Sequence, residues 1–560
     1  MNRLTRNPWV ALAALCFAEL LVMVDNTIVN VALPTMAHDL DAGISGLQWI
    51  VDAYTLAFAG LLLTGGYLGD RFGHRRMLGV GIVGFVGVSI LAALAGGLDQ
   101  LIAARAGLGV FAALVFPATL ALVTTIFTEP RQRAAAVGIW AAVSGVAVAI
   151  GPVLGGWLLE HFSWTSVFWV NVPIGAVALA AILAVVPSTR PEHVGRFDLP
   201  GLVLSILTLG LLTFSVIEAP NVGWVSVRTI GGLVLAGLLL VLFVRRQLTT
   251  DHPILDVRLF TNRHFATAAT MISVAFFALF GFIFLITQFF QAVKGYGPLD
   301  AGVRTLPFAI VMAVLSPVAM VLSNRFGPRM VTAGGAALMS AGFALVEFST
   351  SSSTYWGLIV WSMSLMAAGL ACISGPCTHV IMNALRPEQA GAGSAVNDTT
   401  REIGGTLGVA VLGSILTSAY VTGVGSRLGD LGVPRTVTEI AQQSVMGGVA
   451  VAERAPAGVA DAIRTAVQDV FMTGLHHAVW AAVVVTAVAA VAALWLLREE
   501  PIDVPSPPSN RVVFVTPVWH GVPRHGRKGG RNGDCELSHP PIGVVQVDGS
   551  NDEGDERDGL

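Results

Sequence analysis

Charge is what this sequence has least of. Asp, Glu, Lys and Arg together make up 12% of its 560 residues, about half the share that is usual in soluble domains. Apolar residues account for 54% of the chain, and the mean hydropathy is +0.73. Because a water-facing surface needs more charge than this, the composition excludes an ordinary soluble protein.

An excess of basic charge is missing as well. The formal net charge is −3, whereas a surface that binds nucleic acid needs clustered Lys and Arg. We therefore expect no nucleic acid among the partners of this protein.

Cysteine is scarce, and so are the usual motifs of catalysis. Cys16, Cys372, Cys377 and Cys535 have neither the spacing of a disulfide framework nor that of a zinc site. The sequence also lacks a Gly-rich nucleotide loop, a metal-ligand set and a nucleophile with a base partner. We therefore expect neither an enzyme nor a bound cofactor or metal.

Long apolar runs, by contrast, recur along the chain. A helix needs about 20 apolar residues to cross the hydrocarbon core of a bilayer, and we identify about fourteen such runs. They cover residues 9–31, 47–69, 77–97, 100–124, 134–158, 166–187, 200–217, 228–244, 265–290, 301–322, 330–348, 355–381, 390–420 and 476–497. The sequence thus predicts an all-α, polytopic membrane protein with 14 transmembrane helices. No A-x-A-like cleavage site follows the first run, so we expect it to be retained as a helix.

Arginine is distributed unevenly between the loops. One alternate set of loops holds Arg71, Arg75 and Arg76; Arg131 and Arg133; Arg190 and Arg196; Arg245, Arg246, Arg258 and Arg263; Arg325 and Arg329; and Arg386. The first three loops of the opposite set, around Asp39, Asp99 and Glu160, hold no Arg or Lys. Because Arg and Lys concentrate in short cytoplasmic loops, both termini are predicted to be cytoplasmic.

Two segments fall outside the pattern of spans. The long segment 421–475 would lie outside the cell, and its helical apolar spacing predicts a short cap. Residues 498–560 contain proline clusters, a basic stretch and an acidic end, which is typical of a disordered tail, here cytoplasmic. Arg greatly outnumbers Lys, and Ala, Gly and Val are abundant, which indicates a GC-rich bacterial source.

An internal repeat divides the predicted spans. Asp70-Arg71-Phe72-Gly73-His74-Arg75 returns as Asn324-Arg325-Phe326-Gly327-Pro328-Arg329, at an offset of 254 residues. A weaker echo of residues 129–132 occurs at 386–389. Repeats on the same side of the membrane indicate parallel halves. We therefore predict an N-terminal six-helix half (1–190), two inserted helices (191–250), a C-terminal six-helix half (251–497) and the tail (498–560).

Two charged residues are buried in apolar runs of the first half. Asp25 is expected about 12 Å below the outer end of its helix, and Arg105 about 8 Å below that surface. A charge at such depth costs at least a few kcal/mol unless it is neutralised, paired or exposed to a wet cavity. We predict that the two side chains pair across a cavity and that Asp25 takes up protons. The alternatives are a structural acid bonded to Thr27, Asn26 or Asn30, and an arginine that reaches the outer headgroups.

A third charged group lies in the run at 390–420. Asp398, Arg401 and Glu402 have the i, i+3, i+4 spacing that places three side chains on one face of a helix. A face with three charges cannot meet lipid, so it must look into the helix bundle. Two interpretations stay open: an ion-pair network that closes the cytoplasmic side, or direct binding of protons or cargo.

Two glycine-containing segments are candidates for conformational change. In the loop segment 66–76, Gly66 and Gly73 permit a tight turn and close helix approach, and Asp70, Arg71 and Arg75 can form contacts that lock one state. In the run at 134–158, Gly151 and Gly155 permit close helix packing, while Pro152 bends the helix.

Taken together, these segments resemble the major facilitator superfamily, and within it the fourteen-helix drug:proton antiporter family. The resemblance covers residues 9–497. It is carried by the first-helix segment Asp25–Pro34, the loop segment Gly66–Arg76, Arg105 with Gly109, the fifth-helix segment Gly145–Gly156 and the thirteenth-helix segment Ser394–Gly404.

The resemblance implies a multidrug efflux antiporter of the cell membrane. Such a protein exports amphipathic, often cationic, compounds in exchange for protons by rocking its two halves about a central cavity, with membrane lipids around it, without a cofactor and as a monomer. It would place proton coupling and cargo binding at Asp25, Asn30, Arg105, Asp398, Arg401 and Glu402. Two alternatives stay open: an exporter of one lipid-like metabolite, and a membrane receptor that transports nothing.

Overall fold

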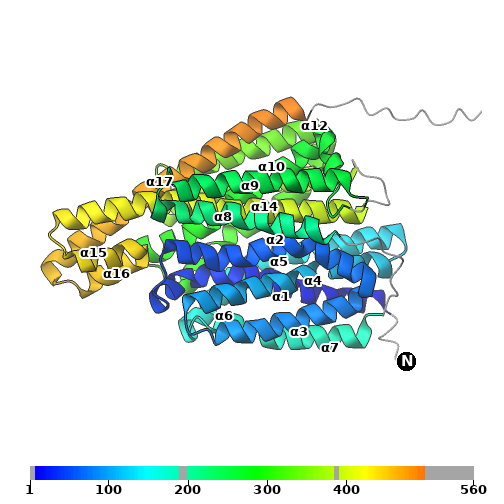
Figure 1. Cartoon of the computed structure of the whole chain (residues 1–560), viewed down its shortest axis with the longest axis horizontal. Coiled ribbons are helices and arrows are strands. Elements are labelled where there is room, and N and C mark those ends of the chain that lie inside the picture. Colours follow the sequence, from blue (N-terminus) through cyan, green and yellow to red (C-terminus); the bar gives the residue numbers. More distant parts are fainter. Residues whose placement is uncertain (1–6, 188–197, 252, 384–389, 498–560) are drawn as a thin grey trace, which may run out of the picture. The chain divides into compact units, whose positions relative to one another are not determined.

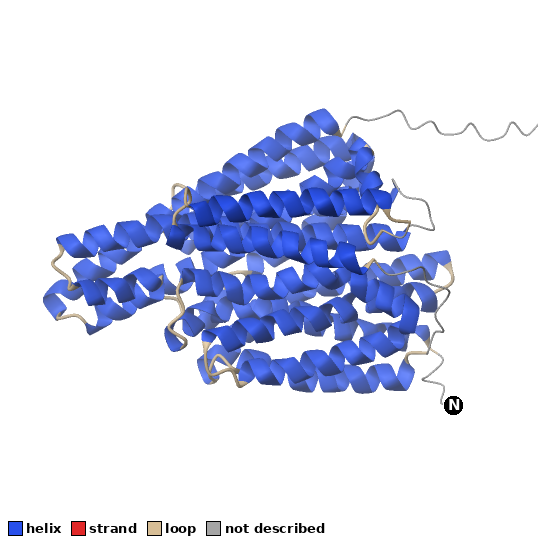
Figure 2. Cartoon of the chain, in the orientation of Figure 1, coloured by secondary structure: helices blue, strands red, loops and turns tan. Residues whose placement is uncertain are grey.

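The computed structural model describes residues 7–187, 198–251, 253–383 and 390–497. In this part of the chain every regular element is a helix (Figures 1 and 2). The predicted tail (498–560) and the loop arginines Arg190, Arg196 and Arg386 lie outside the described residues.

The helices fall into two sets joined by a pair. The N set comprises α1 (Pro8–Asp39), α2 (Ile44–Phe72), α3 (His74–Ala93), α4 (Leu98–Ile126), α5 (Pro130–His161), α6 (Ser166–Trp169) and α7 (Asn171–Val185). The connecting pair is α8 (Leu199–Val222) and α9 (Val227–Thr249). The C set comprises η2 (Val257–Thr261), α10 (Arg263–Gln288), η3 (Phe289–Val293), α11 (Pro298–Val303), α12 (Leu306–Val346), η4 (Tyr355–Ile359), α13 (Val360–Asn383), α14 (Ala390–Asp430), α15 (Arg435–Gln443), α16 (Val445–Arg454) and α17 (Ala457–Leu496).

The long helices have the length and composition of membrane spans. Twelve helical segments in the described part of the chain are long and apolar enough to cross a bilayer. Each of the fourteen apolar runs in the sequence coincides with helix. The prediction of an all-helical, polytopic membrane protein is therefore confirmed.

Several helix boundaries differ from the predicted ones, those of α1 and α17 among them. α1 continues through Pro34 to Asp39, because a proline removes only one ladder bond and the surrounding turns are buried. Run 301–322 begins in α11 and continues in α12, which also contains most of run 330–348; the non-helical backbone at Gly327 (φ 80°) divides α12 where the sequence predicted a boundary. The last helix begins at Ala457 and not near residue 476, because apolar residues continue along its buried face.

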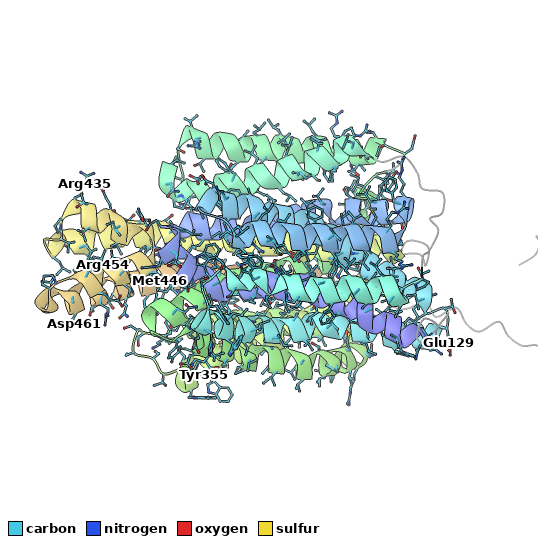
Figure 3. The ribbon with its side chains drawn as sticks, turned by 90° about the horizontal axis from the view of Figure 1, so that it is seen from below. Glu129, Tyr355, Arg435, Met446, Arg454 and Asp461 are labelled. Carbon is cyan, nitrogen blue, oxygen red and sulfur yellow. The ribbon has the colours of Figure 1, made fainter. Side chains whose placement is uncertain are left out.

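Segment 421–475 forms a cap of helices. α14 extends to Asp430, α15 and α16 follow, and the first turns of α17 complete the cap. Ile463, Val467 and Phe471 are buried in it, as their helical spacing predicted. Figure 3 shows Arg435, Arg454 and Asp461 in this region, at the opposite end of the helices from Glu129.

The N set and the C set pack in the same pattern. α1 packs on α4, α5 and α7, and α10 packs on α13, α14 and α17. Gly73 joins α2 to α3 with a φ of 96°, and Gly327 joins the two parts of α12 with a φ of 80°. The guanidinium carbon of Arg71 lies 5.6 Å from the Phe72 ring, and that of Arg325 lies 5.5 Å from the Phe326 ring. The repeat seen in the sequence is thus reproduced in backbone and side-chain geometry.

The end of the helices at which α1 begins is called the Pro8 end below, and the end at which it finishes is called the Asp39 end. Between the two sets, α2 packs on α14, and α5 packs on α11. The connecting helix α8 packs on both α2 and α14, whereas α9 packs mainly on α8. α1 also packs on α10, and α5 on α12, so several helices of each set take part in the contact between them.

Candidate functional site

Two fully buried charges of the N set form an ion pair between α1 and α4. Nη1 of Arg105 lies 2.7 Å from Oδ2 of Asp25, and both side chains are fully inaccessible to solvent. The sequence predicted that these residues pair, and the structure brings them together. Because α1 reaches Asp39, Asp25 lies about 21 Å from the nearer helix end and not about 12 Å.

Neighbouring helices hold each partner in a fixed orientation. Nδ2 of Asn171 on α7 donates to Oδ1 of Asp25 (2.7 Å) and to the Ser89 hydroxyl (3.2 Å). Nε of Arg105 donates to the carbonyl oxygen of Ile50 (2.9 Å). The guanidinium carbon of Arg105 lies 4.3 Å from the centre of the Tyr54 ring, a favourable cation–π geometry. Five helices thus converge on one carboxylate and one guanidinium.

Part of this cluster has no hydrogen-bond partner. Among the described residues, Arg105 Nη2 and Asn171 Oδ1 are buried and unpaired. The attraction within a buried ion pair offsets the cost of removing both charges from water only when the geometry is good and additional hydrogen bonds are formed. The open donor and acceptor mean that the arrangement is not fully satisfied in this state. Groups that are left open in this way can accept a new partner when a proton or a cargo molecule arrives.

Asp52 on α2 is a buried acid that the sequence analysis did not single out. Its side chain is fully inaccessible, and neither carboxylate oxygen has a hydrogen-bond partner in the described chain. Asp52 was not predicted because it lies only a few residues from the polar start of its helix. Like Asp25, however, it is an acidic residue inside an apolar run (47–69), and this pattern could have identified it. An unpaired buried carboxyl is costly in its ionised form and is therefore a candidate for proton binding.

Replacing Asp52 by asparagine is expected to lower transport about ten-fold, equivalent to about 1.4 kcal/mol, without lowering thermal stability. The amide keeps the shape of the side chain but cannot exchange a proton. The comparison is Asp41→Asn, which changes an exposed acid in the loop after α1. Uptake into proteoliposomes and thermal unfolding of the purified protein provide the two readouts. Transport at the wild-type level in Asp52→Asn would remove Asp52 from the pathway.

Asn30 is not part of the Asp25 cluster. Its side-chain amide donates to the carbonyl oxygen of Asn26, one turn earlier on α1 (3.1 Å). The Thr27 hydroxyl likewise bonds to backbone carbonyls, those of Met23 and Val24 on α1 and that of Ala147 on α5. A cargo-binding role for Asn30 remains a prediction.

The second charged group lies on α14 in the C set. Nη1 of Arg401 lies 3.8 Å from Oδ1 of Asp398, and Nη2 contacts the hydroxyls of Ser374 and Thr378 (3.4 and 3.3 Å). Glu402 is buried, and its Oε2 atom has no hydrogen-bond partner in the described chain. Glu402 lies one turn before Thr406, which bonds to Thr55 on α2, so this part of α14 lies beside the N set. That all three side chains line one inward face remains a prediction.

The loop segment 66–76 forms local contacts at the Pro8 end. Asp70 and His74 are 3.0 Å apart, and Arg71 donates to the Tyr67 hydroxyl (3.1 Å). Arg75 donates to the carbonyl oxygen of Leu183 on α7 (2.7 Å). These contacts lie within the N set, so a gating role for Gly66, Asp70, Arg71, Gly73 and Arg75 remains a prediction.

The glycine segment of α5 lies between α1 and the C set. A Cβ atom on Gly151 would collide with the Thr27 hydroxyl, and one on Gly155 would lie 2.7 Å from Cγ1 of Ile28. Both neighbours follow Asp25 closely on α1. The carbonyl of Pro152 is packed directly against Gly302 of α11. α5 therefore contacts the helix of the buried acid on one side and the other set on its opposite side.

The contacts between the sets lie in the half of the helices toward the Asp39 end. Nε2 of Gln48 on α2 donates to the carbonyl oxygens of Val409 and Ala410 on α14 (3.1 and 2.9 Å). The Thr406 hydroxyl donates to that of Thr55 (2.9 Å). Gln291 of η3 donates to the carbonyl oxygen of Val31 on α1 (2.8 Å).

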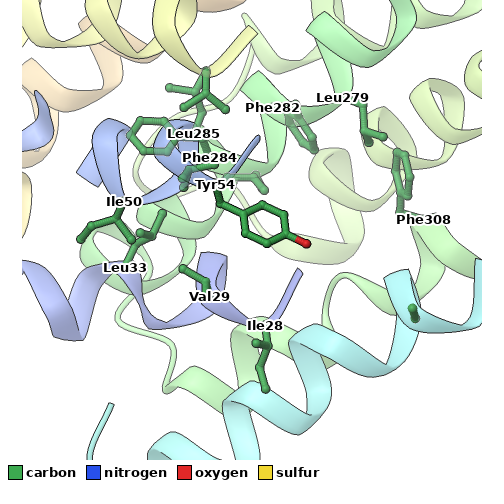
Figure 4. Packing of buried hydrophobic residues seen from close by; sticks show 14 of the residues in the cluster. Ile28, Val29, Leu33, Ile50, Tyr54, Leu279, Phe282, Phe284, Leu285 and Phe308 are labelled. Atoms are coloured by element: carbon green, nitrogen blue, oxygen red, sulfur yellow. The ribbon is translucent and has the colours of Figure 1, made fainter. Parts of the chain in front are cut away.

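Apolar side chains join the sets in the same region. α1 packs on α10, and Figure 4 shows Val29 of α1, Ile50 and Tyr54 of α2, and Phe284 and Leu285 of α10 in one view of the buried cluster. All of these residues belong to one buried cluster that includes both sets. These polar and apolar contacts together form a closed junction between the two sets, on the Asp39 side of the Asp25–Arg105 pair.

Gly156 gives a direct test of this junction. Its Cβ position lies 2.5 Å from Cα of Leu299 and 2.6 Å from the carbonyl oxygen of Pro298, both on α11. Because these are backbone atoms, rotamer changes cannot relieve the clash. Gly156→Ala is therefore expected to destabilise closure at the Asp39 end and to reduce transport. Gly138→Ala, on the same helix with no atom within 4 Å of the Cβ position, is the control.

The expected shift can be measured with spin labels on exposed residues of the two sets, Phe162 and Val303. Gly156→Ala should move the interlabel distance toward longer values, whereas Gly138→Ala should reproduce the unmodified distribution. An unchanged distribution in Gly156→Ala would show that the close α5–α11 approach does not control the junction.

Comparison with known proteins gives consistent results. Residues 15–409 match the model of the Major Facilitator Superfamily. The multidrug resistance protein Stp of Mycobacterium tuberculosis is 37% identical over 74% of this chain and 77% of its own length. The methyl viologen resistance protein SmvA of Salmonella typhimurium is 38% identical over 74% of this chain and 83% of its own length. Among solved structures, an inward-facing, unoccupied bacterial homologue of the human lysosomal transporter Spinster is similar with a TM-score of 0.62. It is 18% identical and covers 88% of this chain and 99% of its own.

Proposed function

The chain belongs to the major facilitator superfamily, and from this premise we propose that it exports amphipathic or cationic drugs from the cell in exchange for protons. It is a multi-pass transporter of the cell membrane, not an enzyme. The names of its relatives support multidrug efflux, and that of SmvA supports a cationic cargo. The observation that carries the proton coupling is the fully buried Asp25–Arg105 pair at 2.7 Å.

The proposed topology has fourteen spans and cytoplasmic termini. α12 contains 41 residues, about 60 Å of helix, which is twice the hydrocarbon thickness and is divided at Gly327. α5, with 32 residues, is long enough for another span. Counted in this way, the candidates reach fourteen. The arginines of the loops at the Pro8 end support a cytoplasmic position for that end.

The proposed architecture has two halves that rock about the buried charges. The N set corresponds to the half predicted at 1–190, the pair α8 and α9 to the insertion, and the C set to the half at 251–497. The contacts of Gln48, Thr55 and Gln291 support a state that is closed at the Asp39 end. In the opposite state these contacts would separate, and the Asp39 end would open to the outside.

The proposed cycle begins with a proton on Asp25 in the outward-open state. Protonation removes the negative charge, so the attraction between Asp25 and Arg105 is lost and Arg105 is released to other acceptors. Because α1 next to Asp25 packs on Gly151 and Gly155 of α5, and α5 packs on α11, a change at Asp25 can be transmitted to the junction. The halves then close at the Asp39 end. The proton leaves on the cytoplasmic side as the Asp25–Arg105 pair re-forms. The inward gradient of protons thereby drives cargo outward.

The acids on α14 are proposed to attract the cargo. Glu402 is buried with an unpaired Oε2 atom, and Asp398 contacts Arg401 at 3.8 Å. A cationic drug between the sets would gain electrostatic attraction from the carboxylates. Its binding would also favour proton release, since a positive ligand and a bound proton compete for the same negative charge.

The test uses proteoliposomes that contain the purified protein and an imposed proton gradient. We expect the gradient to drive transport of methyl viologen and of a lipophilic fluorescent cation, and an uncoupler to abolish it. Transport of one lipid-like metabolite but of neither cation would indicate a dedicated exporter. A ligand distribution that is unchanged when the gradient collapses, across a panel of cations, would contradict the proposed function.

A further inference from the structure

A groove between α10 and α17 lies outside the charged site. It has a volume of about 410 Å³ and is lined by Ala266, Thr267, Thr270, Met271 and Val274 of α10 and by six residues of α17. The hydroxyls of Thr267 and Thr270 donate to carbonyl oxygens of their own helix. The lining therefore offers apolar contacts. The volume is within the range of about 300–1,000 Å³ that is usual for ligand sites.

The sequence of α17 explains why a groove forms here. Val484, Val488, Ala492 and Leu496 follow each other at intervals of four residues and therefore lie along one ridge of the helix. Short side chains at most of these positions leave space against α10. At the repeat offset of 254 residues, Met271 and Val274 correspond to Phe17 and Leu20 of α1. These bulkier side chains are packed against the core of the N set, so the groove is not a simple consequence of the repeated fold.

The groove has the length of one membrane leaflet. From Val484 to Leu496 the helix rises about 18 Å at 1.5 Å per residue, and half of a 30 Å hydrocarbon core is about 15 Å. Val484, Val488 and Leu496 are about half exposed, so the groove is open along its side. It reaches the Pro8 end, where α10 begins and α17 finishes.

A basic side chain stands at that end of the groove. Arg263 is exposed and precedes Ala266 and Thr267 by three and four residues, which places it on the same face of α10. It lies in the first turn of α10, where the helix dipole disfavours a positive charge. Helix stability therefore does not account for this residue at this position. Positive charge beside an apolar groove complements a lipid with an anionic headgroup.

We propose that this groove holds one acyl chain of an anionic phospholipid from the leaflet at the Pro8 end, with its headgroup on Arg263. The lipid would fill the space between α10 and α17 and hold it closed to other apolar molecules. This proposal concerns a resident lipid and does not depend on proton coupling or on the nature of the cargo.

The test measures lipid retained by the purified full-length protein. Protein is exchanged into mixed micelles with equal amounts of phosphatidylglycerol and phosphatidylethanolamine that carry the same acyl chains, and bound lipid is counted by native mass spectrometry. We expect one phospholipid per chain, with phosphatidylglycerol preferred about five-fold, which corresponds to about 1 kcal/mol for one basic side chain at an anionic surface.

Two kinds of variant test the acyl-chain site and the headgroup site separately. Ala492→Phe fills the groove and should abolish retention of both lipids, while Val491→Phe, on the same helix but outside the lining, should retain them. Arg263→Gln should keep one lipid but reduce the preference to about equal binding. Val488→Phe provides a second filling variant at an exposed position if Ala492→Phe does not fold.

Three results would overturn the proposal. The first is that the filling variants retain as much lipid as the wild type. The second is that the wild type shows no preference for the anionic headgroup. The third is that methyl viologen or a lipophilic cation displaces the lipid at concentrations at which that cation is transported. The last result would make the groove an entry path for cargo.

Discussion

Asp25→Asn is expected to abolish proton-driven accumulation and to lower the unfolding temperature, because the buried guanidinium of Arg105 loses its counter-charge. The asparagine side chain has the same size, and its one oxygen can still accept the hydrogen bond from Arg105, while its NH2 group replaces the oxygen that accepts from Asn171 in the wild type. It cannot bind and release a proton. One proton that moves down 100 mV supplies about 2.3 kcal/mol, enough for a concentration ratio of about fifty-fold. We therefore expect the accumulation ratio in proteoliposomes to fall from tens to about one.

The matched control for this variant lies on the same helix. Asp39→Asn changes an exposed acid at the end of α1, where Asp39 contacts only the neighbouring His38 among its described side-chain partners. It should transport at the wild-type rate. Exchange without a gradient should persist in Asp25→Asn if the variant still changes conformation. Gradient-driven accumulation by Asp25→Asn at the wild-type level would show that this carboxyl does not couple transport to protons.

Arg105→Leu is expected to cause the largest loss of stability. Removing one partner of a fully buried ion pair leaves the other charge uncompensated, which typically costs about 3–5 kcal/mol. The variant also loses the hydrogen bond to Ile50 and the stacking on Tyr54. We expect a lower unfolding temperature in detergent and no coupled transport.

A double variant separates charge from packing. In Asp25→Asn combined with Arg105→Gln, both charges are removed and the two amides can bond to each other, so most of the stability should return. Transport should not return, because no group at the site binds a proton. An unfolding temperature of Arg105→Leu equal to that of the wild type would mean that the pair contributes little to the fold. Coupled transport in the double variant would exclude the pair from the mechanism.

Much of this architecture follows from the sequence because bilayer thickness sets helix length. A run such as 100–124 has no stable alternative to a spanning helix, and α4 covers it entirely. The boundary at Gly327 was also predicted, since the runs 301–322 and 330–348 lie on either side of it and the segment 324–329 repeats the turn at 70–75. The early start of α17 was not predicted, because its first turns lie in the cap, where the apolar runs are shorter.

The candidate site was predictable where a charge interrupts an apolar run. Arg105 is the one charged residue of run 100–124, and Asp25 shares run 9–31 with Glu19 alone, so the cost of burying a charge predicts a partner for Arg105 and for Asp25. Asn171 could not be predicted as a partner of Asp25, because burying an amide costs less than burying a charge and its partners are set by the way α7 packs. Gly156 was not distinguished from Gly155 by sequence. Which glycine faces α1 and which faces α11 depends on the rotation of α5.

Infrared difference spectroscopy of the Asp25 carboxyl is the most direct test of the proposed coupling. Spectra of the reconstituted protein are recorded across a pH titration and during transport, with Asp25→Asn as the reference. We predict a protonated carboxyl band that grows as the pH falls, changes when a cationic substrate is added, and is missing in Asp25→Asn. A carboxyl that keeps one protonation state through the titration and through turnover would contradict the central role of the Asp25–Arg105 pair.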